Sequence, residues 1–305
     1  MPTPPRAPIL LLLVLPLVGC ASTPDPKAGE PVPYDPNWAR TDAPEPIGKL
    51  LATVDMSMRA WTKLVMSAQT EEERRQARGL ELDLMRRVRP RLTELVHELE
   101  NGPPANRIPA AAALGFTRTA EAQSPLLNAL HDPNADVVNN ALIGLAVLQL
   151  ADTPIATIAD LYAHHPESYV RSNAAWALRS LIEAGADGTA VVEPARLALS
   201  DPEPFVRAQS ALILALQKDA ESVAAIGELA RESTPFVLIA AAEALAQLGR
   251  EEPRAKGPAA RELVRAWTHV DKKLQGVLRR ALIKLSGENR GDKLEDWVEW
   301  AAKLP

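Results

Sequence analysis

Cysteine and aromatic residues are scarce in this chain of 305 residues. A single Cys excludes an intramolecular disulfide and a zinc site built from several cysteines. Only 3 Phe, 3 Tyr and 6 Trp contribute to a hydrophobic content of 47%, so most apolar residues are Ala, Leu, Val and Ile. Because Ala and Leu favour helices, we expect a helical protein whose core is built mainly from aliphatic side chains.

The chain also lacks an excess of positive charge. Its formal net charge is -5 and its isoelectric point is about 5.7. Proteins that bind nucleic acid usually carry a basic stripe that neutralises phosphates. We therefore expect no nucleic-acid partner.

Signatures of catalysis and of metal or cofactor binding are missing as well. The sequence contains no P-loop, no nucleophile elbow and no Gly-rich strand-to-helix turn. Its histidines form no pair at the i, i+4 spacing of a helical metal site. They are His97, His131, His164, His165 and His269. The sequence predicts a protein that is not an enzyme, with no metal and no small-molecule cofactor.

The 27 prolines are distributed unevenly. Twelve of them lie within residues 1–46, and residues 21–46 contain seven without any hydrophobic periodicity. Proline favours the extended polyproline II conformation, which rises about 3.1 Å per residue. We predict that residues 20–46 form a disordered tether that reaches up to roughly 80 Å when extended.

An uncharged apolar run of eleven residues, 9–19, precedes the cysteine. It is shorter than the roughly 20 residues that span a bilayer, and it has the length of a signal-peptide core, about 7–15 residues. The sequence Leu17-Val18-Gly19-Cys20 matches the lipobox at every position and resembles bacterial lipoproteins. An ordinary secretory cleavage site, with Gly19 and Ala21 as its small residues, is the alternative.

The resemblance to lipoproteins has three implications. Residues 1–19 would be a lipoprotein signal peptide, and Cys20 would become the first residue of the mature chain. Cys20 would carry a diacylglycerol and acyl chains such as palmitate, which anchor it in the membrane of a bacterial cell envelope. Ala21 stands where an Asp would favour retention in the inner membrane, so the outer membrane is favoured over the inner one.

Helical spacing dominates from Ile47 onward. Apolar residues recur at steps of three and four in residues 50–65 and again in 80–99. We predict two amphipathic helices that form an N-terminal helical cap over 47–90. Pro90 lacks a backbone donor and is expected to kink or divide the second helix.

A repeating unit follows this cap. Each copy has an aliphatic anchor, a small residue four positions later and a large apolar residue eight positions later. Successive anchors are 29, 33, 36, 31 and 40 residues apart, a period near 34. The anchors are Ile108, Val137, Val170, Val206, Val237 and Val277. Since a shorter apolar segment precedes each anchored helix, the pattern predicts a unit of two helices joined by a Pro-bearing turn.

These units resemble HEAT repeats, including the phycobilisome-lyase type of HEAT-like repeat, over residues 91–287. The motifs that carry the resemblance are Asp132-Pro133 with Val137, Pro166 with Val170-Arg171, and Asp201-Pro202 with Val206-Arg207. The resemblance implies an all-α, right-handed and armadillo-like α-solenoid of about six helix pairs. It also implies a ladder of Asp and Arg side chains between adjacent repeats. His165, Thr234 and Leu238 depart from that ladder pattern.

The last segment, 288–305, is predicted to form a C-terminal capping helix. Trp297 and Trp300 lie one helical turn apart and would cover the open end of the stack. A binding site lined by these tryptophans is the alternative.

The second helix of each repeat is expected to line the concave side of the solenoid. Amide side chains stand three positions after successive anchors, at Asn140, Asn173 and Gln209. Apolar side chains stand six positions after the same anchors, including Trp176 and Leu212. Because Trp is enriched at binding hot spots, we predict that these five residues contact a partner protein. Packing between repeats and hydration of the amides is the alternative.

The function predicted from these features is a lipid-anchored interaction scaffold of the cell envelope, with an unidentified protein as its partner. Two alternatives remain at this stage. One is a lyase-like or other enzyme built on HEAT-like repeats. The other is a structural envelope protein that contacts peptidoglycan.

Overall fold

The computed structural model describes residues 44–67 and 70–305. The chain divides into two units, Met1–Pro44 and Glu45–Pro305, and every described helix lies in the second. The predicted signal peptide (1–19) and most of the predicted tether (20–46) lie outside the described residues. Among the described helices, none combines the length and hydrophobicity that crossing a membrane requires.

Six consecutive helix pairs make up most of Glu45–Pro305, and the described residues include no β-strand. This confirms the prediction of an all-α solenoid of about six repeats. The pairs are α3 (Leu92–Asn101) and α4 (Pro104–Gly115), α5 (Gln123–Ala129) and α6 (Ala135–Leu148), α7 (Ala156–His164) and α8 (Ser168–Glu183), α9 (Val192–Ala198) and α10 (Pro204–Leu216), α11 (Val223–Leu229) and α12 (Pro235–Glu251), and α13 (Lys256–Trp267) and α14 (Lys272–Ser286).

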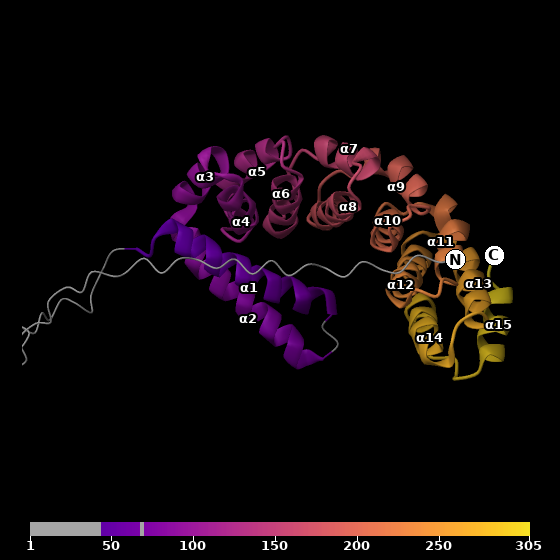
Figure 1. Cartoon of the computed structure of the whole chain (residues 1–305). Coiled ribbons are helices and arrows are strands. Elements are labelled where there is room, and N and C mark those ends of the chain that lie inside the picture. The colour runs from indigo at the N-terminus through magenta and orange to yellow at the C-terminus, as the bar shows by residue number, and fades with distance from the viewer. Residues whose placement is uncertain (1–43, 68–69) are drawn as a thin grey trace, which may run out of the picture. The chain divides into compact units, whose positions relative to one another are not determined.

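The two helices of a pair occupy different layers of this unit. Figure 1 shows α3, α5, α7, α9, α11 and α13 along the outer side of the curve, and α4, α6, α8, α10, α12 and α14 along the inner side. Short 3-10 turns lead into five of the outer helices: η1 (Arg89–Arg91), η2 (Ala120–Ala122), η3 (Thr189–Val191), η4 (Ala220–Ser222) and η5 (Pro253–Ala255). Three inner helices begin with proline, which suits the first helical position because its missing N–H has no partner there.

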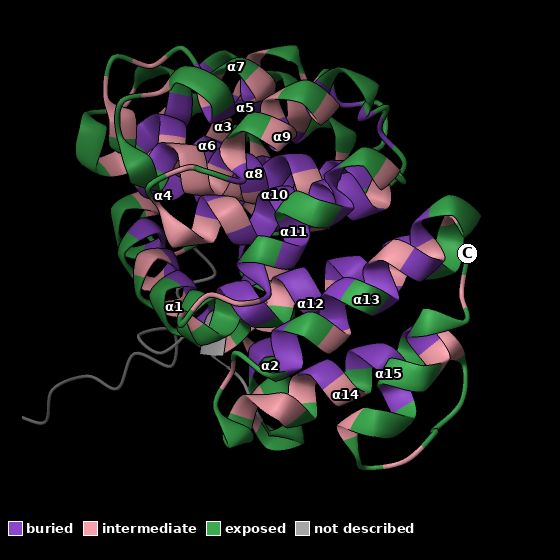
Figure 2. Cartoon of the chain, turned by 90° about the vertical axis from the view of Figure 1, so that its right-hand side faces the viewer, coloured by how far each residue is buried: buried purple, intermediate pink, exposed green. Residues whose placement is uncertain are grey.

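The repeating apolar positions form the core. The anchors Val137, Val170, Val206 and Val237 are fully buried, whereas Ile108 and Val277 in the terminal repeats are half-buried. The small residues four positions later are buried in all six repeats, as are the large residues eight positions later. Figure 2 shows buried segments along α8, α10 and α12, as this register requires. The predicted register of small residues and large apolar residues is therefore buried in every repeat.

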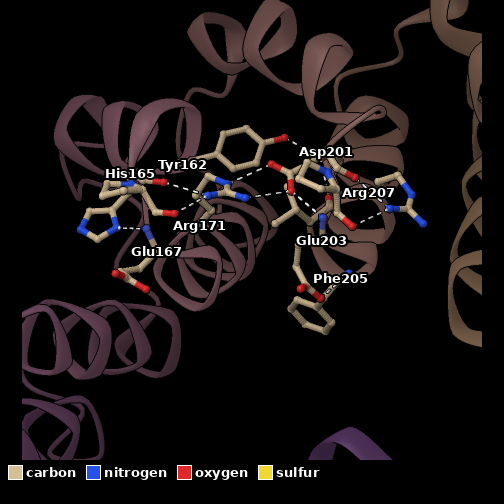
Figure 3. A network of polar contacts seen from close by, with 12 residues as sticks. Tyr162, His165, Glu167, Arg171, Asp201, Glu203, Phe205 and Arg207 are labelled. Carbon is tan, nitrogen blue, oxygen red and sulfur yellow. Dashed lines mark hydrogen bonds and ion pairs between the residues drawn. The ribbon is translucent and has the colours of Figure 1, made fainter. Parts of the chain in front are cut away.

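The predicted Asp–Arg ladder is present in part. Arg171 at the start of α8 donates two hydrogen bonds to Asp201, with Nε to Oδ2 at 2.9 Å and Nη2 to Oδ1 at 3.1 Å. The same guanidinium donates to the carbonyl of His165 at 2.8 Å. Arg207 repeats this arrangement one repeat later. It donates to the carbonyl of Asp201 (Figure 3) and to the carboxylate of Glu232. Each arginine thus fixes its own turn and joins it to the next.

Three positions of the ladder differ from the expected pattern. Asp132 is paired with Arg107, which precedes the anchor of its repeat instead of following it. Glu232 takes the place of the Asp that the pattern would put at Thr234. Between α6 and α8 the arginine position holds Val138, which is buried, and Asn173 Nδ2 instead donates to Asn139 Oδ1 at 2.7 Å.

The N-terminal segment forms two helices, α1 (Ile47–Ser67) and α2 (Glu71–Val88). A capping box between Thr70 and Glu73 starts α2. The short 3-10 turn η1 (Arg89–Arg91) contains Pro90 and separates α2 from α3, as expected for a proline without a backbone donor. α1 packs on α4 and lies along the inner side of the stack (Figure 1). The cap predicted over 47–90 therefore extends along the concave face as well as lying near the end of the stack.

The C-terminal helix α15 (Leu294–Ala302) packs on α13. Trp297 is fully buried, and its Nε1 donates to the carbonyl of Gly291 at 3.2 Å. Trp300 lies edge to face against Trp297, with ring centroids 5.8 Å apart, and the guanidinium of Arg290 lies 5.3 Å from the Trp300 ring centroid. Both tryptophans are thus engaged in packing at this end.

Candidate functional site

An apolar groove runs along the inner side of the solenoid. It consists of two adjoining cavities of about 380 and 340 Å³ that share Val65, Trp176 and Phe205 in their walls. Tyr169 completes the first cavity and Phe236 the second. We call the two cavities together, with all the residues that line them, the inner groove.

One wall of the inner groove comes from outside the repeats. Trp61 of α1 is buried, and its ring meets Phe116 edge to face with centroids 5.1 Å apart. The same ring lies 6.3 Å from Trp176 of α8. These contacts hold the C-terminal half of α1 against the inner helices. Val65, one turn after Trp61, is 45% exposed and faces the groove.

Another wall comes from one position of three successive repeats. Tyr169, Phe205 and Phe236 each stand directly before a buried anchor valine. Tyr169 and Phe236 are 39% and 46% exposed, although large aromatic side chains are usually mostly buried. With Trp61 and Trp176, the groove contains five of the twelve aromatic residues of the chain.

Two side chains that line the second cavity each carry a buried polar atom without a hydrogen-bond partner. The Oε1 atom of Gln209 and the Nε atom of Arg179 are both buried and unpaired, and both side chains line the second cavity. Gln209 is 7% exposed. A buried donor or acceptor left unpaired costs about 1–3 kcal/mol, so most buried polar atoms in folded proteins have a partner. An unpaired acceptor and an unpaired donor on two side chains of one cavity are therefore unusual.

The charged groups near the groove are few. Arg179 forms an ion pair with Glu183 at 3.4 Å. Partial burial of the Tyr169 hydroxyl, together with the nearby carboxylates of Asp136 and Glu167, raises the pKa of that tyrosine. Tyr169 is therefore neutral near pH 7, and its ring presents an uncharged surface.

The structure brings three of the predicted partner-binding residues together. Asn173, Trp176 and Gln209 all line the inner groove. Asn140 instead lines a neighbouring cavity, where its Nδ2 donates to the carbonyl of Asp136 at 2.8 Å. Leu212 is half-buried and packs against the core. Cys20, the predicted site of lipidation, lies outside the described residues.

Sequence reasoning missed the aromatic wall and the contribution of α1. A signal for the wall was present, since Tyr169, Phe205 and Phe236 share the position before the anchor. No such signal existed for Trp61 and Val65, because the pattern of an amphipathic helix shows that a face is buried without showing which helix covers it.

The described residues contain no group of three His, Cys, Asp or Glu side chains that could hold a metal ion. His164 is exposed and its Nδ1 lies 3.0 Å from Asp160. The Nδ1 atom of His165 accepts a hydrogen bond from the backbone N–H of Glu167. These histidines have local roles at the turn before α8.

Comparison with known proteins identifies the repeats. The family model for HEAT repeats matches residues 92–179 and 192–284. None of the curated proteins matches the sequence significantly. Solved structures share the fold at low sequence identity.

Three of these structures illustrate the range of sequence identity, coverage and TM-score. A designed armadillo repeat protein is 18% identical, covers 64% of this chain and 99% of its own, and superposes with a TM-score of 0.50. An engineered protein is 21% identical over 64% of this chain and 96% of its own, with a TM-score of 0.49. Human deoxyhypusine hydroxylase in complex with glycerol is 16% identical over 80% of this chain and 100% of its own, with a TM-score of 0.37.

Proposed function

Because this chain belongs to the HEAT-repeat family, we propose that it is an interaction scaffold that binds another protein through the inner groove. Repeat solenoids offer an extended concave surface for binding. A fold alone does not fix a function, so the proposal depends on the site. The observation that carries it is the exposure of Tyr169 and Phe236 beside Trp176, in a chain that is otherwise poor in aromatic residues.

The groove has the properties of a protein-binding surface. Aromatic residues are enriched in the buried centres of interfaces, and Trp and Tyr are enriched among the residues whose truncation weakens binding most. Asn173 and Gln209 add amide groups between these apolar side chains. Asn140 borders the same face, and Leu212 would support the groove from the layer beneath.

We further propose that the scaffold is anchored in a bacterial cell envelope. The support is the sequence Leu17-Val18-Gly19-Cys20 after an apolar run of signal-peptide length. A lipid attached to Cys20 would hold the protein at a membrane, since each buried CH₂ group stabilises attachment by roughly 0.8 kcal/mol. The outer membrane remains favoured over the inner one because Ala21 follows the cysteine.

Crosslinking in living cells tests the scaffold proposal. A photoreactive amino acid replaces Ser172, which lines the groove on α8, and captured proteins are identified by mass spectrometry. We expect one or a few proteins to be captured reproducibly from the envelope. The matched control carries the same photoreactive group at Leu197 of α9, which is 79% exposed on the outer layer. Equal capture of the same proteins from both positions contradicts the proposal.

The proposed lipid anchor has a separate test. Cys20→Ser removes the proposed acceptor, so the protein should move from the membrane fraction to the soluble fraction and lose incorporation of a labelled palmitate analogue. Ala21→Ser is the control and should leave both unchanged. A Cys20→Ser protein that remains membrane-bound and normally processed shows that the anchor is elsewhere.

A further inference from the structure

We infer that the inner groove binds an extended peptide segment of its partner, and that it recognises the main chain of this peptide as well as its large apolar side chains. This inference rests on the proposed scaffold function and specifies the chemistry of the partner. The juxtaposition that carries it is an aromatic wall beside an unpaired buried acceptor, Gln209 Oε1, and an unpaired buried donor, Arg179 Nε.

The two unpaired atoms fit one kind of ligand. A peptide unit carries one N–H donor and one C=O acceptor, which complement the Gln209 oxygen and the Arg179 nitrogen. The last torsion of a Gln side chain is broad, so a small rotation turns its amide toward a bound chain. A lipid tail would fill the apolar cavities and leave both polar atoms unpaired in a drier site, which costs binding energy. The pair of atoms therefore favours a peptide over a lipid.

The apolar walls fit large side chains of such a peptide. The first cavity, of about 380 Å³, lies between Trp61, Tyr169 and Trp176. The second, of about 340 Å³, lies between Phe205 and Phe236. Each has room for an aromatic or a large aliphatic side chain. Because the two cavities share Val65, Trp176 and Phe205, one continuous chain can occupy both.

The spacing of the helices sets the length of the segment. Neighbouring packed helices lie about 8–10 Å apart, and an extended chain advances about 3.3 Å per residue. About three residues of an extended peptide therefore separate one inner helix from the next. A segment of roughly seven residues crosses α8, α10 and α12, with apolar side chains about three positions apart.

The test uses the purified full-length chain carrying Cys20→Ser, so that no anchor contributes to binding. A phage-displayed library of random peptides of about twelve residues is selected on this protein. The strongest binder is synthesised with a fluorescent label, and its affinity is measured by fluorescence anisotropy. We expect the selected peptides to share two large apolar residues about three positions apart.

Two variants of the groove should then weaken binding without lowering stability. Phe236→Ala removes a side chain that is 46% exposed, so it should fold normally and bind the peptide on the order of tenfold more weakly. Gln209→Met removes the unpaired oxygen with little change in volume. It should also weaken binding on the order of tenfold, while its thermal midpoint stays equal or rises. Leu197→Ala on the outer layer is the control and should change neither quantity.

Several outcomes overturn the inference. One is selection of peptides whose affinity is unchanged in both Phe236→Ala and Gln209→Met. Another is failure to select any peptide. A third is binding of the same protein to phosphatidylglycerol vesicles that Phe236→Ala abolishes and Gln209→Met leaves unchanged, because this identifies the groove as a lipid site.

The scaffold proposal and the peptide inference fail in different ways. Capture of a partner in cells that Phe236→Ala and Gln209→Met leave intact supports the scaffold and overturns the peptide groove. Selected peptides that depend on both residues, without any captured protein in cells, support the peptide groove and contradict the scaffold.

Discussion

Asp219 shows how single side chains join the outer layer of adjacent repeats. Its Oδ2 accepts a hydrogen bond from Nε of Arg196 on α9 at 2.8 Å, and it also accepts from the Ser222 hydroxyl. Asp219 itself is 9% exposed. These bonds, first of all the one from Arg196, hold the pKa of the Asp219 carboxyl below its usual range. The pair links α9 to the turn before α11.

Asp219→Asn should therefore destabilise the fold in a pH-dependent way. A carboxyl whose pKa is lower in the folded state stabilises the fold above its unfolded pKa, near pH 4, and this contribution is lost as the pH falls from there. We expect a loss of about 1–2 kcal/mol at pH 7 that shrinks below pH 4. Urea unfolding of both proteins at a series of pH values measures it. A difference in the free energy of unfolding that stays constant across that pH range contradicts an ionic origin of the effect. Asp160→Asn on the exposed face of α7 is the control.

At the same scale, the sequence predicted the buried register of the repeats but only part of the site. The anchors and the residues four and eight positions later were predictable, because a helix that packs on two neighbours repeats its small and large residues at fixed steps. Trp176 and Gln209 were predictable from the same frame. Phe205 and Phe236 were missed, because a residue directly before a buried anchor lies outside the apolar stripe of its helix.

The inner helices α4 and α6 approach each other closely where each carries a glycine. A Cβ atom added to Gly115 at the end of α4 would lie 2.3 Å from the carbonyl oxygen of Gly144 in α6. Since the contact is with backbone, no side-chain rotation can relieve it. The distance between α4 and α6 is therefore set by these two residues.

Gly115→Ala should separate α4 from α6 and lower the free energy of unfolding. Overpacking of this kind costs about 1–3 kcal/mol. Gly79→Ala in α2 is the matched control, because a Cβ atom there meets no atom within 4 Å. In an exposed helix that change should stabilise the protein by about 0.5–1 kcal/mol. Chemical denaturation measures both, and similar effects of the two changes contradict the steric argument.

Element positions were less predictable than element types. The hydrophobic spacing predicted two helices in 47–90, and α1 and α2 are present. It did not predict that Trp61 reaches both Phe116 and Trp176, which lie 55 and 115 residues further along the chain. An amphipathic pattern predicts that one face of a helix is buried. Which helix buries that face depends on the curvature of the whole stack.

At the scale of the whole molecule, a destabilising substitution should loosen the solenoid only near the changed residue. Each repeat contacts its neighbours, so stability is close to a sum of repeat and interface contributions. The arginine ladder follows the same rule, since Arg171 and Arg207 each bridge one turn to the next. A defect at one end should therefore loosen that end first.

Trp297→Ala tests this locality at the C-terminal end. The side chain is fully buried where α15 packs on α13, and truncating a buried Trp costs about 3–5 kcal/mol. Hydrogen exchange measured by mass spectrometry should show lost protection in α13, α14 and α15, with α4, α6 and α8 unchanged. Val298→Ala, one residue away and 45% exposed, should leave the whole profile unchanged. An equal loss of protection from α4 to α15 would mean that the stack unfolds as one cooperative unit. In that case the inner groove, in the middle of the stack, would lose its shape whenever either end is damaged.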